Sequence, residues 1–238
     1  MPRLDVLVTR SGLAESRERA QALIMAGKVR VAGETVRRPD RSVSDDASIS
    51  VDAAPGYASR GALKLAPALA TFGVDPSGLV CADIGASTGG FTDVLLRRGA
   101  ARVYAVDVGR GLLHWRLRQD PRVVVIERVN ARELEGFPET VSLMVVDVSF
   151  IGLEKVLPAL RRAAPAAEVV ALFKPQFQVG RSEVGKGGVV RDQAAIDAAL
   201  DSFRRWCAGN GYAVRAEAPS ELPGADGNRE IFVDLVSM

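Results

Sequence analysis

Short apolar runs that alternate with helical patterns constrain the fold of this chain most strongly. From residue 79 onward the runs are rich in valine; they are LVCADIG, RVYAVDVG, RVVVIE, VSLMVVDVS, EVVALFK, YAVRAEAP and REIFVDLV. Continuous apolar runs are typical of parallel strands that helices cover on both faces. The alternation therefore predicts an α/β fold with a doubly wound, seven-stranded sheet. In such a sheet a ligand binds at the carboxyl ends of the strands.

A glycine-rich turn follows the first of these predicted strands. The stretch CADIGASTGGFTDVLL, residues 81–96, runs from the strand through the turn into a predicted helix. Gly85, Gly89 and Gly90 let the backbone approach a ligand closely, and the start of the helix adds N–H donors. Asp107 ends the second strand, where an acid can bind a pair of ribose hydroxyls. The pattern indicates a cofactor site.

Two cofactors compete for this turn. A dinucleotide site needs the spacing G-x-G-x-x-G, which brings a pyrophosphate to the helix N-terminus. Here Ser87 stands in place of the second glycine, and Asp83 stands just before the turn. A carboxylate at that position suits the ammonium group of an amino acid better than it suits a pyrophosphate. The residues therefore favour S-adenosylmethionine, which has no phosphate, over a dinucleotide and over a plain tight turn without a ligand.

Two lysines and two carboxylates stand near the predicted strand ends or on the helix before the first strand. They are Lys64, Asp147, Lys174 and Glu230. In a doubly wound sheet these four side chains can converge at the mouth of the ligand site. Each of them alone is explained as an ordinary surface charge, and this explanation is strongest for Lys64. Together they indicate chemistry at the cofactor mouth.

The segment after the fourth predicted strand narrows the choice of methyl acceptor. Enzymes that methylate amino groups often carry Asn/Asp-Pro-Pro-aromatic there, and DVSF lacks the prolines. Methylation of a cytosine carbon needs a cysteine nucleophile beside the substrate, and neither Cys81 nor Cys207 is placed for it. A ribose hydroxyl needs only a group that steers its proton away, as a lysine with a lowered pKa between acids can do. The residues therefore favour a ribose hydroxyl.

Residues 1–53 have the pattern of a small α+β domain. Two short helical patterns, RLDVLVTRSGL and SRERAQALIMAG, precede the alternating segment KVRVAGETV and the short strand ASISVD. Ser16 and Gly27 suit the two ends of the second helix. The alternating segment turns at Ala32 and Gly33, which predicts a hairpin.

The boundary between the two parts of the chain is predicted from residues that break structure. Pro55 and Gly56 lie in APGYASRG, so residues 54–61 are expected to form a linker. Residues 62–238 then form the second domain. A length of 238 residues allows one full-sized domain and a small one.

Positive charge is concentrated near the N-terminus. Residues 3–41 hold nine basic and five acidic side chains, an excess of four, whereas the whole chain has a net charge of +2. Such an excess is typical either of a solvated face or of a patch that binds phosphates. The candidate RNA-binding residues are Arg3, Arg17, Arg19, Lys28, Arg30, Arg37 and Arg38.

Composition excludes several classes of protein. The hydrophobic fraction of 47% is ample for a folded core. The two cysteines are too few for a disulfide framework and show no metal-ligand spacing. No window approaches 18 uninterrupted apolar residues, and MPRLDVLVTRSGL has no long apolar core. We therefore expect no metal, no membrane span and a cytoplasmic location.

The N-terminal pattern resembles a known RNA-binding domain. The segment LAESRERAQALIMAGKVRVAGETVRRPDRSVSDDASISV is similar to the small domain first known from a small-subunit ribosomal protein, ribosomal protein S4, and also found in pseudouridine synthases. The shared features are the Ser-Arg pair that opens the helix, the apolar spacing, AGKVRVAG and the trailing strand. The resemblance implies that residues 1–53 bind RNA.

Motifs over nearly the whole chain resemble the TlyA family of ribosomal-RNA methyltransferases, whose members are also labelled haemolysin A. The motifs are YASRGALKL, DIGASTGGFTDVLLRRGA, VYAVDVGRGLL, RQDPRVVVIERVNAREL, DVSFIGLEKVLPAL, KPQFQVG, GKGGVVRD and GNREIF. The resemblance implies an RNA-binding domain joined to a Rossmann-like, FtsJ-like methyltransferase domain. It also implies methyl transfer from S-adenosylmethionine to the 2′-hydroxyl of cytidines in ribosomal RNA.

The resemblance assigns roles to individual residues. The family's K-D-K-E set falls on Lys64, Asp147, Lys174 and Glu230. Lys174 is implied to act on the 2′-hydroxyl, Asp147 and Lys64 to position the hydroxyl and the methyl group, and Glu230 to hold the lysines. The implied cofactor residues are Asp83, Gly85, Ala86, Ser87, Thr88, Gly89, Gly90 and Phe91, with Asp107 and Asn130 around the ribose and adenine.

The match to the family has mild departures. Ala58, Ala62 and Gln178 stand where a valine, a glycine and a glutamate are expected. The chain begins two residues before RLDVLV and stops at FVDLVSM, which resembles the short form of the family. The short form implies 23S rRNA of the 50S subunit as the only target, whereas the long form implies both 16S and 23S rRNA.

Two further functions remain as alternatives at this point. One is an RNA-binding protein whose methyltransferase fold no longer catalyses, which the intact lysine and carboxylate set disfavours. The other is a pore, which the haemolysin label suggests. A pore needs a spanning helix, a barrel repeat or a strongly amphipathic helix, and the sequence shows none. The basic, glycine-rich segment GKGGVVRD, residues 185–192, is expected either to cover the RNA or to be an ordinary surface loop.

Overall fold

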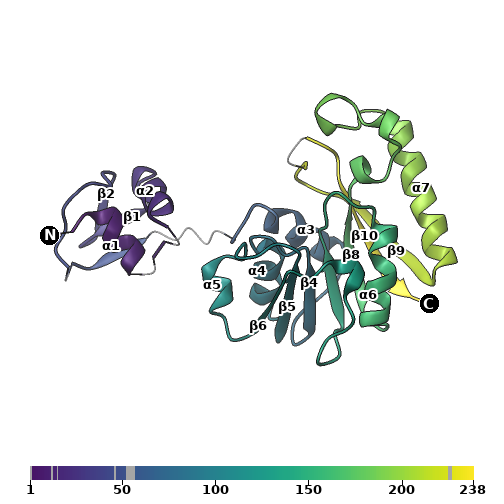
Figure 1. Ribbon diagram of the computed structural model, residues 1–238, viewed down its shortest axis with the longest axis horizontal. Helices are drawn as coiled ribbons and strands as arrows, with labels where there is room; N and C mark the ends of the chain where they lie inside the picture. The colour runs from purple at the N-terminus through teal and green to yellow at the C-terminus, as the bar shows by residue number, and fades with distance from the viewer. Residues whose placement is uncertain (1, 12, 15, 46, 52–56, 225–226) are drawn as a thin grey trace. The chain divides into compact units, whose positions relative to one another are not determined.

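The computed structural model describes residues 2–11, 13–14, 16–45, 47–51, 57–224 and 227–238 (Figure 1). Contacts divide the chain into two units, Met1–Gly56 and Tyr57–Met238. The predicted breaks at Pro55 and Gly56 lie outside the described residues, so the linker expected over 54–61 is described only from residue 57 onward.

The N-terminal unit packs two helices against a three-stranded antiparallel sheet of order β2-β1-β3. Its elements are α1 (Leu4–Arg10), α2 (Arg17–Met25), β1 (Val29–Val31), β2 (Glu34–Val36) and β3 (Ile49–Val51). The hydroxyl of Ser16 accepts a hydrogen bond from the backbone N–H of Arg19 at 3.1 Å, which confirms the predicted N-cap. Ala32 and Gly33 have positive φ, as a two-residue hairpin turn requires.

A seven-stranded sheet of order β6-β5-β4-β7-β8-β10-β9 forms the centre of the second unit. Its strands are β4 (Val80–Ile84), β5 (Arg102–Asp107), β6 (Val123–Glu127), β7 (Leu143–Val146), β8 (Glu168–Phe173), β9 (Tyr212–Pro219) and β10 (Ile231–Ser237). Strand β10 pairs antiparallel with both β8 and β9, whereas the other pairs are parallel. The predicted α/β fold is confirmed, and the last strand inserts between two earlier ones.

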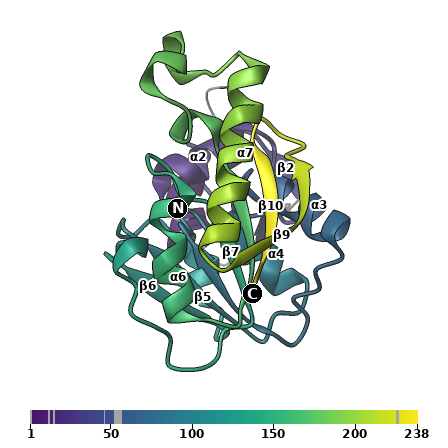
Figure 2. The same ribbon diagram turned by 90° about the vertical axis from the view of Figure 1, so that its right-hand side faces the viewer.

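Helices cover both faces of this sheet (Figures 1 and 2). They are α3 (Ala62–Phe72), α4 (Gly90–Arg97), α5 (Trp115–Arg118), α6 (Leu157–Ala163) and α7 (Gln193–Gly209). Buried leucines of α3 and α4, such as Leu65 and Leu95, belong to the core on one face. Leu160 of α6 and Phe203 of α7 belong to the core on the other face. Burial on both faces explains why the strands are continuously apolar.

The sheet has a topological switch point at β4. This strand pairs with β5 on one side and with β7 on the other. The chain leaves β4 through α4 to β5 and β6, and then crosses to β7 on the opposite side. The connections after β4 and β7 therefore diverge, and a crevice opens at the carboxyl ends of these strands.

Candidate functional site

The glycine-rich turn after β4 forms a backbone cradle with no room for a side chain at its first position. Gly85 has a φ of +85°, and a Cβ atom on it would lie 2.3 Å from the backbone oxygen of Asp147. Asp107, at the end of β5, accepts hydrogen bonds from the backbone N–H groups of Ser87 and Gly109, both at 2.7 Å. These contacts fix the turn directly beside Asp147.

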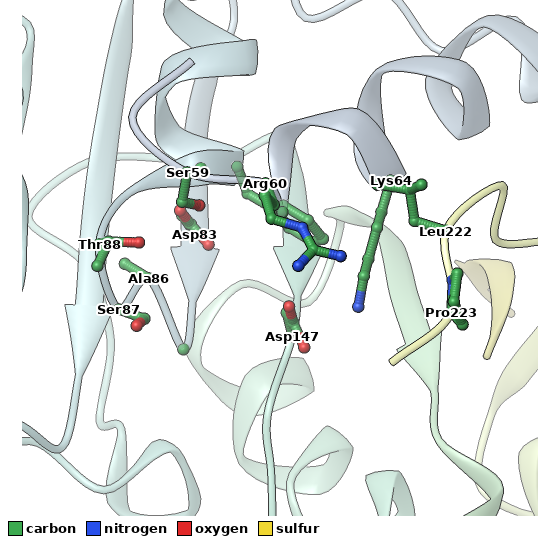
Figure 3. A pocket seen from close by; sticks show the side chains of 14 residues that line it. Ser59, Arg60, Lys64, Asp83, Ala86, Ser87, Thr88, Asp147, Leu222 and Pro223 are labelled. Atoms are coloured by element: carbon green, nitrogen blue, oxygen red, sulfur yellow. The ribbon is translucent and has the colours of Figure 1, made fainter. Parts of the chain in front are cut away.

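Two adjoining cavities of about 320 and 460 Å³ open beside this turn, and Gly85, Ser87 and Asp147 line both of them. The first cavity has several charged residues in its wall (Figure 3). The predicted cofactor-binding residues that line one cavity or the other are Asp83, Gly85, Ala86, Ser87, Thr88, Gly90, Phe91, Asp107 and Asn130. The predicted residue Gly89 lines neither cavity; it is the N-cap of α4.

The two cavities differ in chemical character. The first contains the charged side chains of Lys64 and Asp83. The second is mainly apolar and is lined by Val129, Phe150 and Ile151, with polar groups from Asp107 and Asn130 at its wall. A ligand with a charged amino-acid end and a flat, mostly apolar ring would match this division.

Asp83 presents an unsatisfied carboxylate oxygen in the wall of the first cavity. The side chain is fully buried, and its Oδ2 accepts hydrogen bonds from the backbone N–H and the hydroxyl of Thr92 at 2.8 and 2.6 Å. Its Oδ1 has no hydrogen-bond partner among the described residues. Burial raises the pKa of Asp83 to about 7, although the hydrogen bonds from Thr92 oppose the shift. A buried carboxylate with one free oxygen is suited to bind a cation.

Two lysine–carboxylate pairs lie beside the cavities. Lys64 Nζ on α3 lies 2.6 Å from Glu230 Oε2, just before β10. Lys174 Nζ, just after β8, lies 2.6 Å from Asp147 Oδ1, just after β7. Lys64 and Asp147 both line the first cavity (Figure 3). The fold thus gathers residues that are up to 166 positions apart in the chain.

The contacts of Glu230 differ from the expectation that it holds both lysines. Its carboxylate forms an ion pair with Lys64, while Lys174 is paired with Asp147 and donates a hydrogen bond to the hydroxyl of Ser149 at 2.9 Å. The reason is topological, because β7 and β8 are parallel neighbours whose following residues meet at one edge. Glu230 precedes the reversed strand β10 and faces α3 instead.

Several residues at the site were not predicted, and three of them stand out by their contacts or conformation. Ser149 contacts Lys174, and Arg60 lines the first cavity (Figure 3). Phe150 is 91% exposed beside the second cavity and has a φ of +64°, which is rare for a bulky residue. All three lie within motifs that the sequence shows, SRG and DVSF, but no local pattern distinguishes an exposed phenylalanine from a core one.

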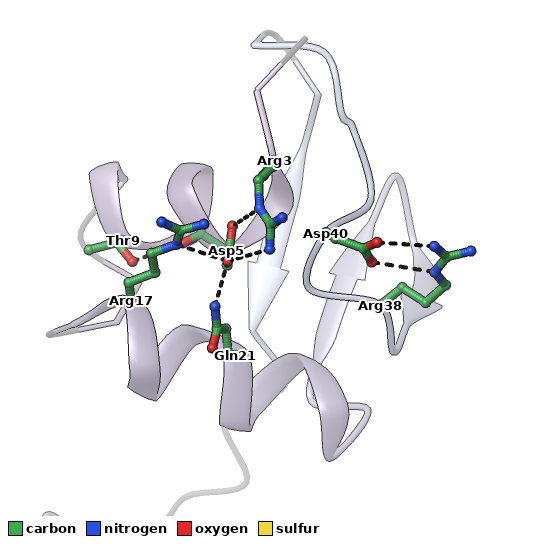
Figure 4. A network of polar contacts seen from close by, with 7 residues as sticks. All are labelled: Arg3, Asp5, Thr9, Arg17, Gln21, Arg38 and Asp40. Atoms are coloured by element: carbon green, nitrogen blue, oxygen red, sulfur yellow. Dashed lines mark hydrogen bonds and ion pairs between the residues drawn. The ribbon is translucent and has the colours of Figure 1, made fainter.

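The N-terminal unit carries its basic residues on the surface. All seven predicted RNA-binding residues are exposed. Two of them, Arg3 and Arg17, are held by the buried carboxylate of Asp5, which Gln21 also contacts (Figure 4). The Arg3 guanidinium holds the pKa of Asp5 below its ordinary range, and hydrogen bonds from Gln21 and Arg17 lower this pKa further. Burial of the carboxyl acts in the opposite direction. One buried acid therefore orients two exposed guanidinium groups.

The described part of the chain holds neither a membrane-spanning helix nor a metal-binding cluster. No described helix is long and apolar enough to cross a membrane. Within the same residues, no group of three or more histidine, cysteine, aspartate or glutamate side chains is arranged to hold a metal ion.

Comparison with protein families matches both units. A family described as FtsJ-like methyltransferase matches residues 57–236, and the S4 domain matches residues 2–49. The chain is 49% identical to the 16S/23S rRNA (cytidine-2′-O)-methyltransferase TlyA of Mycobacterium tuberculosis, over 98% of this chain and 89% of that protein. It is 38% identical to the 23S rRNA (cytidine-2′-O)-methyltransferase TlyA of Campylobacter jejuni, over 74% of this chain and 69% of that protein.

A solved structure is also similar over the whole length. It is the structure of a protein from Streptococcus thermophilus that is named as a hemolysin, and it matches at 41% sequence identity and a TM-score of 0.75. The match covers 99% of this chain and 88% of that chain. The similarity therefore includes both the small N-terminal unit and the seven-stranded unit.

Proposed function

The chain belongs to the TlyA family of FtsJ-like methyltransferases with an S4 domain, and we propose that it transfers a methyl group from S-adenosylmethionine to the 2′-hydroxyl of a cytidine in ribosomal RNA. One observation carries the proposal. Lys64, Asp147, Lys174 and Glu230 form two ion pairs beside a cavity whose wall contains the free carboxylate oxygen of Asp83.

The residues of the cleft fit S-adenosylmethionine. The free Oδ1 of Asp83 suits the ammonium group of its methionine part. Gly85 has no Cβ, so the turn can lie directly against the backbone of Asp147 at the edge of the cleft. Asp107 suits the ribose hydroxyls, and the apolar second cavity with Asn130 suits adenine. When bound, S-adenosylmethionine supplies the electrophilic methyl group. Asp83 stands where it would fix the amino-acid end of that molecule.

The lysine–carboxylate pairs would prepare the ribose hydroxyl. Lys174 Nζ would first pass a proton to the paired carboxylate of Asp147. As the neutral amine it would then take the proton of the 2′-hydroxyl, while the hydroxyl oxygen bonds to the methyl carbon and the bond from that carbon to sulfur breaks. Asp147 and Ser149 would orient Lys174, since both contact its Nζ. Lys64, held by Glu230, would place its charge across the first cavity from the turn. Holding the groups in this geometry removes much of the entropic barrier to transfer.

We propose 23S rRNA of the large subunit as the substrate. The relatives from Mycobacterium tuberculosis and Campylobacter jejuni are both named as methyltransferases of 23S rRNA, whereas only the first is also named for 16S rRNA. The S4 domain and its exposed basic residues support an RNA partner. Because ribosomal subunits are cytoplasmic, we propose the cytoplasm as the compartment of the reaction.

The test uses the full chain, labelled S-adenosylmethionine, and separate 50S and 30S subunits that lack the modification. We expect label on a cytidine ribose of 23S rRNA, mapped by nuclease digestion. Label on both subunits would keep the reaction and replace the single target with two. If calorimetry shows that the cofactor binds but neither subunit is labelled, the proposal is rejected in favour of RNA binding without catalysis.

The Asp5 network gives a prediction for RNA binding. Replacing Asp5 with asparagine places amide N–H groups against guanidinium donors, so Arg3 and Arg17 lose their ion pairs. Hydrogen bonds to a charged group contribute about 1.5–3 kcal/mol. Because both arginines are half exposed, we expect a loss of about 1–2 kcal/mol in the unfolding free energy of the N-terminal unit. Affinity for an rRNA fragment should fall as well.

Urea unfolding and filter binding measure the two effects of Asp5→Asn. The matched control is Asp40→Asn, which removes an exposed ion pair with Arg38 (Figure 4). We expect little change in stability for the control, because exposed pairs contribute about 0–1 kcal/mol. Equal effects of the two substitutions would show that Asp5 has no special role.

A further inference from the structure

A buried asparagine joins two loops beside Glu230. Asn228 lies between β9 and β10 and is only 1% exposed. Its Oδ1 accepts a hydrogen bond from the backbone N–H of Val190 at 2.9 Å, and its Nδ2 donates to the backbone oxygen of Gly188 at 2.9 Å. Both partners belong to the loop of residues 185–191, which precedes α7 (Figure 2). The side-chain amide thus satisfies one backbone N–H and one backbone oxygen of this loop, as the backbone of a neighbouring strand would.

The backbone around Asn228 contacts the site described above. Its carbonyl oxygen accepts a hydrogen bond from the N–H of Gly224 at 2.8 Å. A Cβ on Gly224 would lie 2.6 Å from Glu230 Oε1, so this turn packs directly against the carboxylate that holds Lys64. Leu222, earlier in the same loop, lines the first cavity. Asn228 itself lines neither cavity.

The loop that Asn228 holds is basic and has few contacts of its own. Lys186 and Arg191 are exposed, and among the described residues neither forms an ion pair. Gly187 and Gly188 have positive φ, and the loop closes through the hydrogen bond from the Gly185 N–H to the Val189 oxygen at 3.0 Å. Glycines in such conformations give the unbound loop many alternatives, so a fixed anchor has a large effect on its order.

We propose that Asn228 is a positioning residue for the RNA substrate. It holds the basic loop 185–191 in register with the turn that presents Glu230, so that Lys186 and Arg191 meet RNA phosphates beside the two lysine–carboxylate pairs. The inference rests on the proposed function, because the loop charges act on a polyanion. It adds a residue that touches neither the cofactor cleft nor the reacting atoms.

The first test is the kinetics of Asn228→Ala on the ribosomal subunit. We expect the KM for the subunit to rise about tenfold, because the backbone groups of Val190 and Gly188 lose their buried partner. The Kd for S-adenosylmethionine, measured by calorimetry, should stay as in the wild type. Asn228→Asp should behave similarly, because a carboxylate accepts from Val190 but repels the oxygen of Gly188. The matched control is Asn210→Ala, since this asparagine caps the far end of α7.

A double-mutant cycle separates positioning from general stability. The variant Lys186→Ala/Arg191→Ala removes the loop charges at exposed positions, so it is expected to fold and to raise the KM for the subunit. Adding Asn228→Ala to it should raise the KM little further, because both changes act through one loop. Effects that multiply fully, or a matching loss of cofactor binding, would overturn the positioning role.

The outcomes distinguish this inference from the proposed function. If the wild-type chain labels neither subunit, the proposed function itself fails. If the wild type labels its subunit while Asn228→Ala and the loop variant keep the wild-type KM, the inference alone fails. Should Asn228→Ala not fold, Asn228→Asp and the loop variant carry the test, and an unchanged KM in the loop variant overturns the inference.

Discussion

Replacing Lys174 with methionine is expected to lower the single-turnover rate of methyl transfer by roughly 10²–10⁴-fold, the usual contribution of a positioned acid–base group. Methionine keeps the length of the side chain but can neither bind the ribose hydroxyl nor take its proton. Lys174 lies against Asp147 and Ser149 and outside the walls of both cavities. Binding of S-adenosylmethionine should therefore be retained, which calorimetry measures.

Two further variants sharpen this test. Lys174→Arg keeps a positive charge beside Asp147 but cannot give up a proton at neutral pH, so it should be nearly as slow as the methionine variant. Lys155→Met is the matched control, because Lys155 is an exposed lysine of a short 3₁₀ helix outside the site. A wild-type rate in Lys174→Met would remove Lys174 from the reaction. A wild-type rate in Lys174→Arg alone would limit its role to charge.

Replacing Asp83 with asparagine is expected to weaken binding of S-adenosylmethionine by about 2–5 kcal/mol, which is at least roughly 30-fold in Kd. The asparagine oxygen can still accept from Thr92, so the turn is retained, but an amide group then faces the ligand ammonium. Calorimetry on the full chain measures the change. Asp75→Asn is the matched control, because Asp75 is exposed and caps a turn outside the cleft. Equal Kd values for both variants would contradict the assignment.

The pH dependence of the same carboxyl gives a second measurement. With a pKa of about 7, Asp83 loses its charge as pH falls through neutrality, so cofactor affinity should decline below about pH 7 in the wild type. This part of the pH dependence should be absent in Asp83→Asn. The folded-state pKa is raised above the unfolded value, so Asp83 favours the folded state at low pH and loses that contribution as pH rises through 7.

The Asp83→Asn substitution should therefore raise the stability of the ligand-free protein although it lowers the affinity for the cofactor. At pH 8 the ionised, buried Asp83 destabilises the ligand-free domain, and an asparagine does not. We expect Asp83→Asn to raise the melting temperature of the ligand-free chain at pH 8 while it weakens cofactor binding. A lower melting temperature would indicate that the substitution disturbs the turn, and the binding result could then not be assigned to the ammonium contact.

The local pattern of the sequence predicted the elements well. The run YAVRAEAP predicts the strand that the structure places at β9, Tyr212–Pro219, and the hairpin turn at Ala32 and Gly33 lies where the alternation is interrupted. The run VSLMVVDVS predicts a longer strand than β7, Leu143–Val146, because Asp147 and the residues after it turn into the cleft. Pairing with both neighbours, and not apolar character alone, decides where a strand ends.

The types of residue at the site could also be predicted, but their pairing could not. Acids and lysines after apolar runs indicate a site at one edge of a sheet, whichever order the strands take. Which lysine meets which acid depends on strand order. Lys174 meets Asp147 because β7 and β8 are adjacent, and Glu230 meets Lys64 because β10 is reversed.

The sequence by itself determined the α/β class, the glycine turn, the small basic domain and the four charged residues, because hydrophobic period and turn chemistry act over a few neighbouring positions. Only the tertiary structure decided that Asp83 keeps one oxygen free, that Asp5 orients two arginines, and that Asn228 joins two loops. Each of these depends on the burial of a polar group among residues distant in the chain. Burial and long-range hydrogen bonding follow from how the elements pack, and no local pattern records that packing.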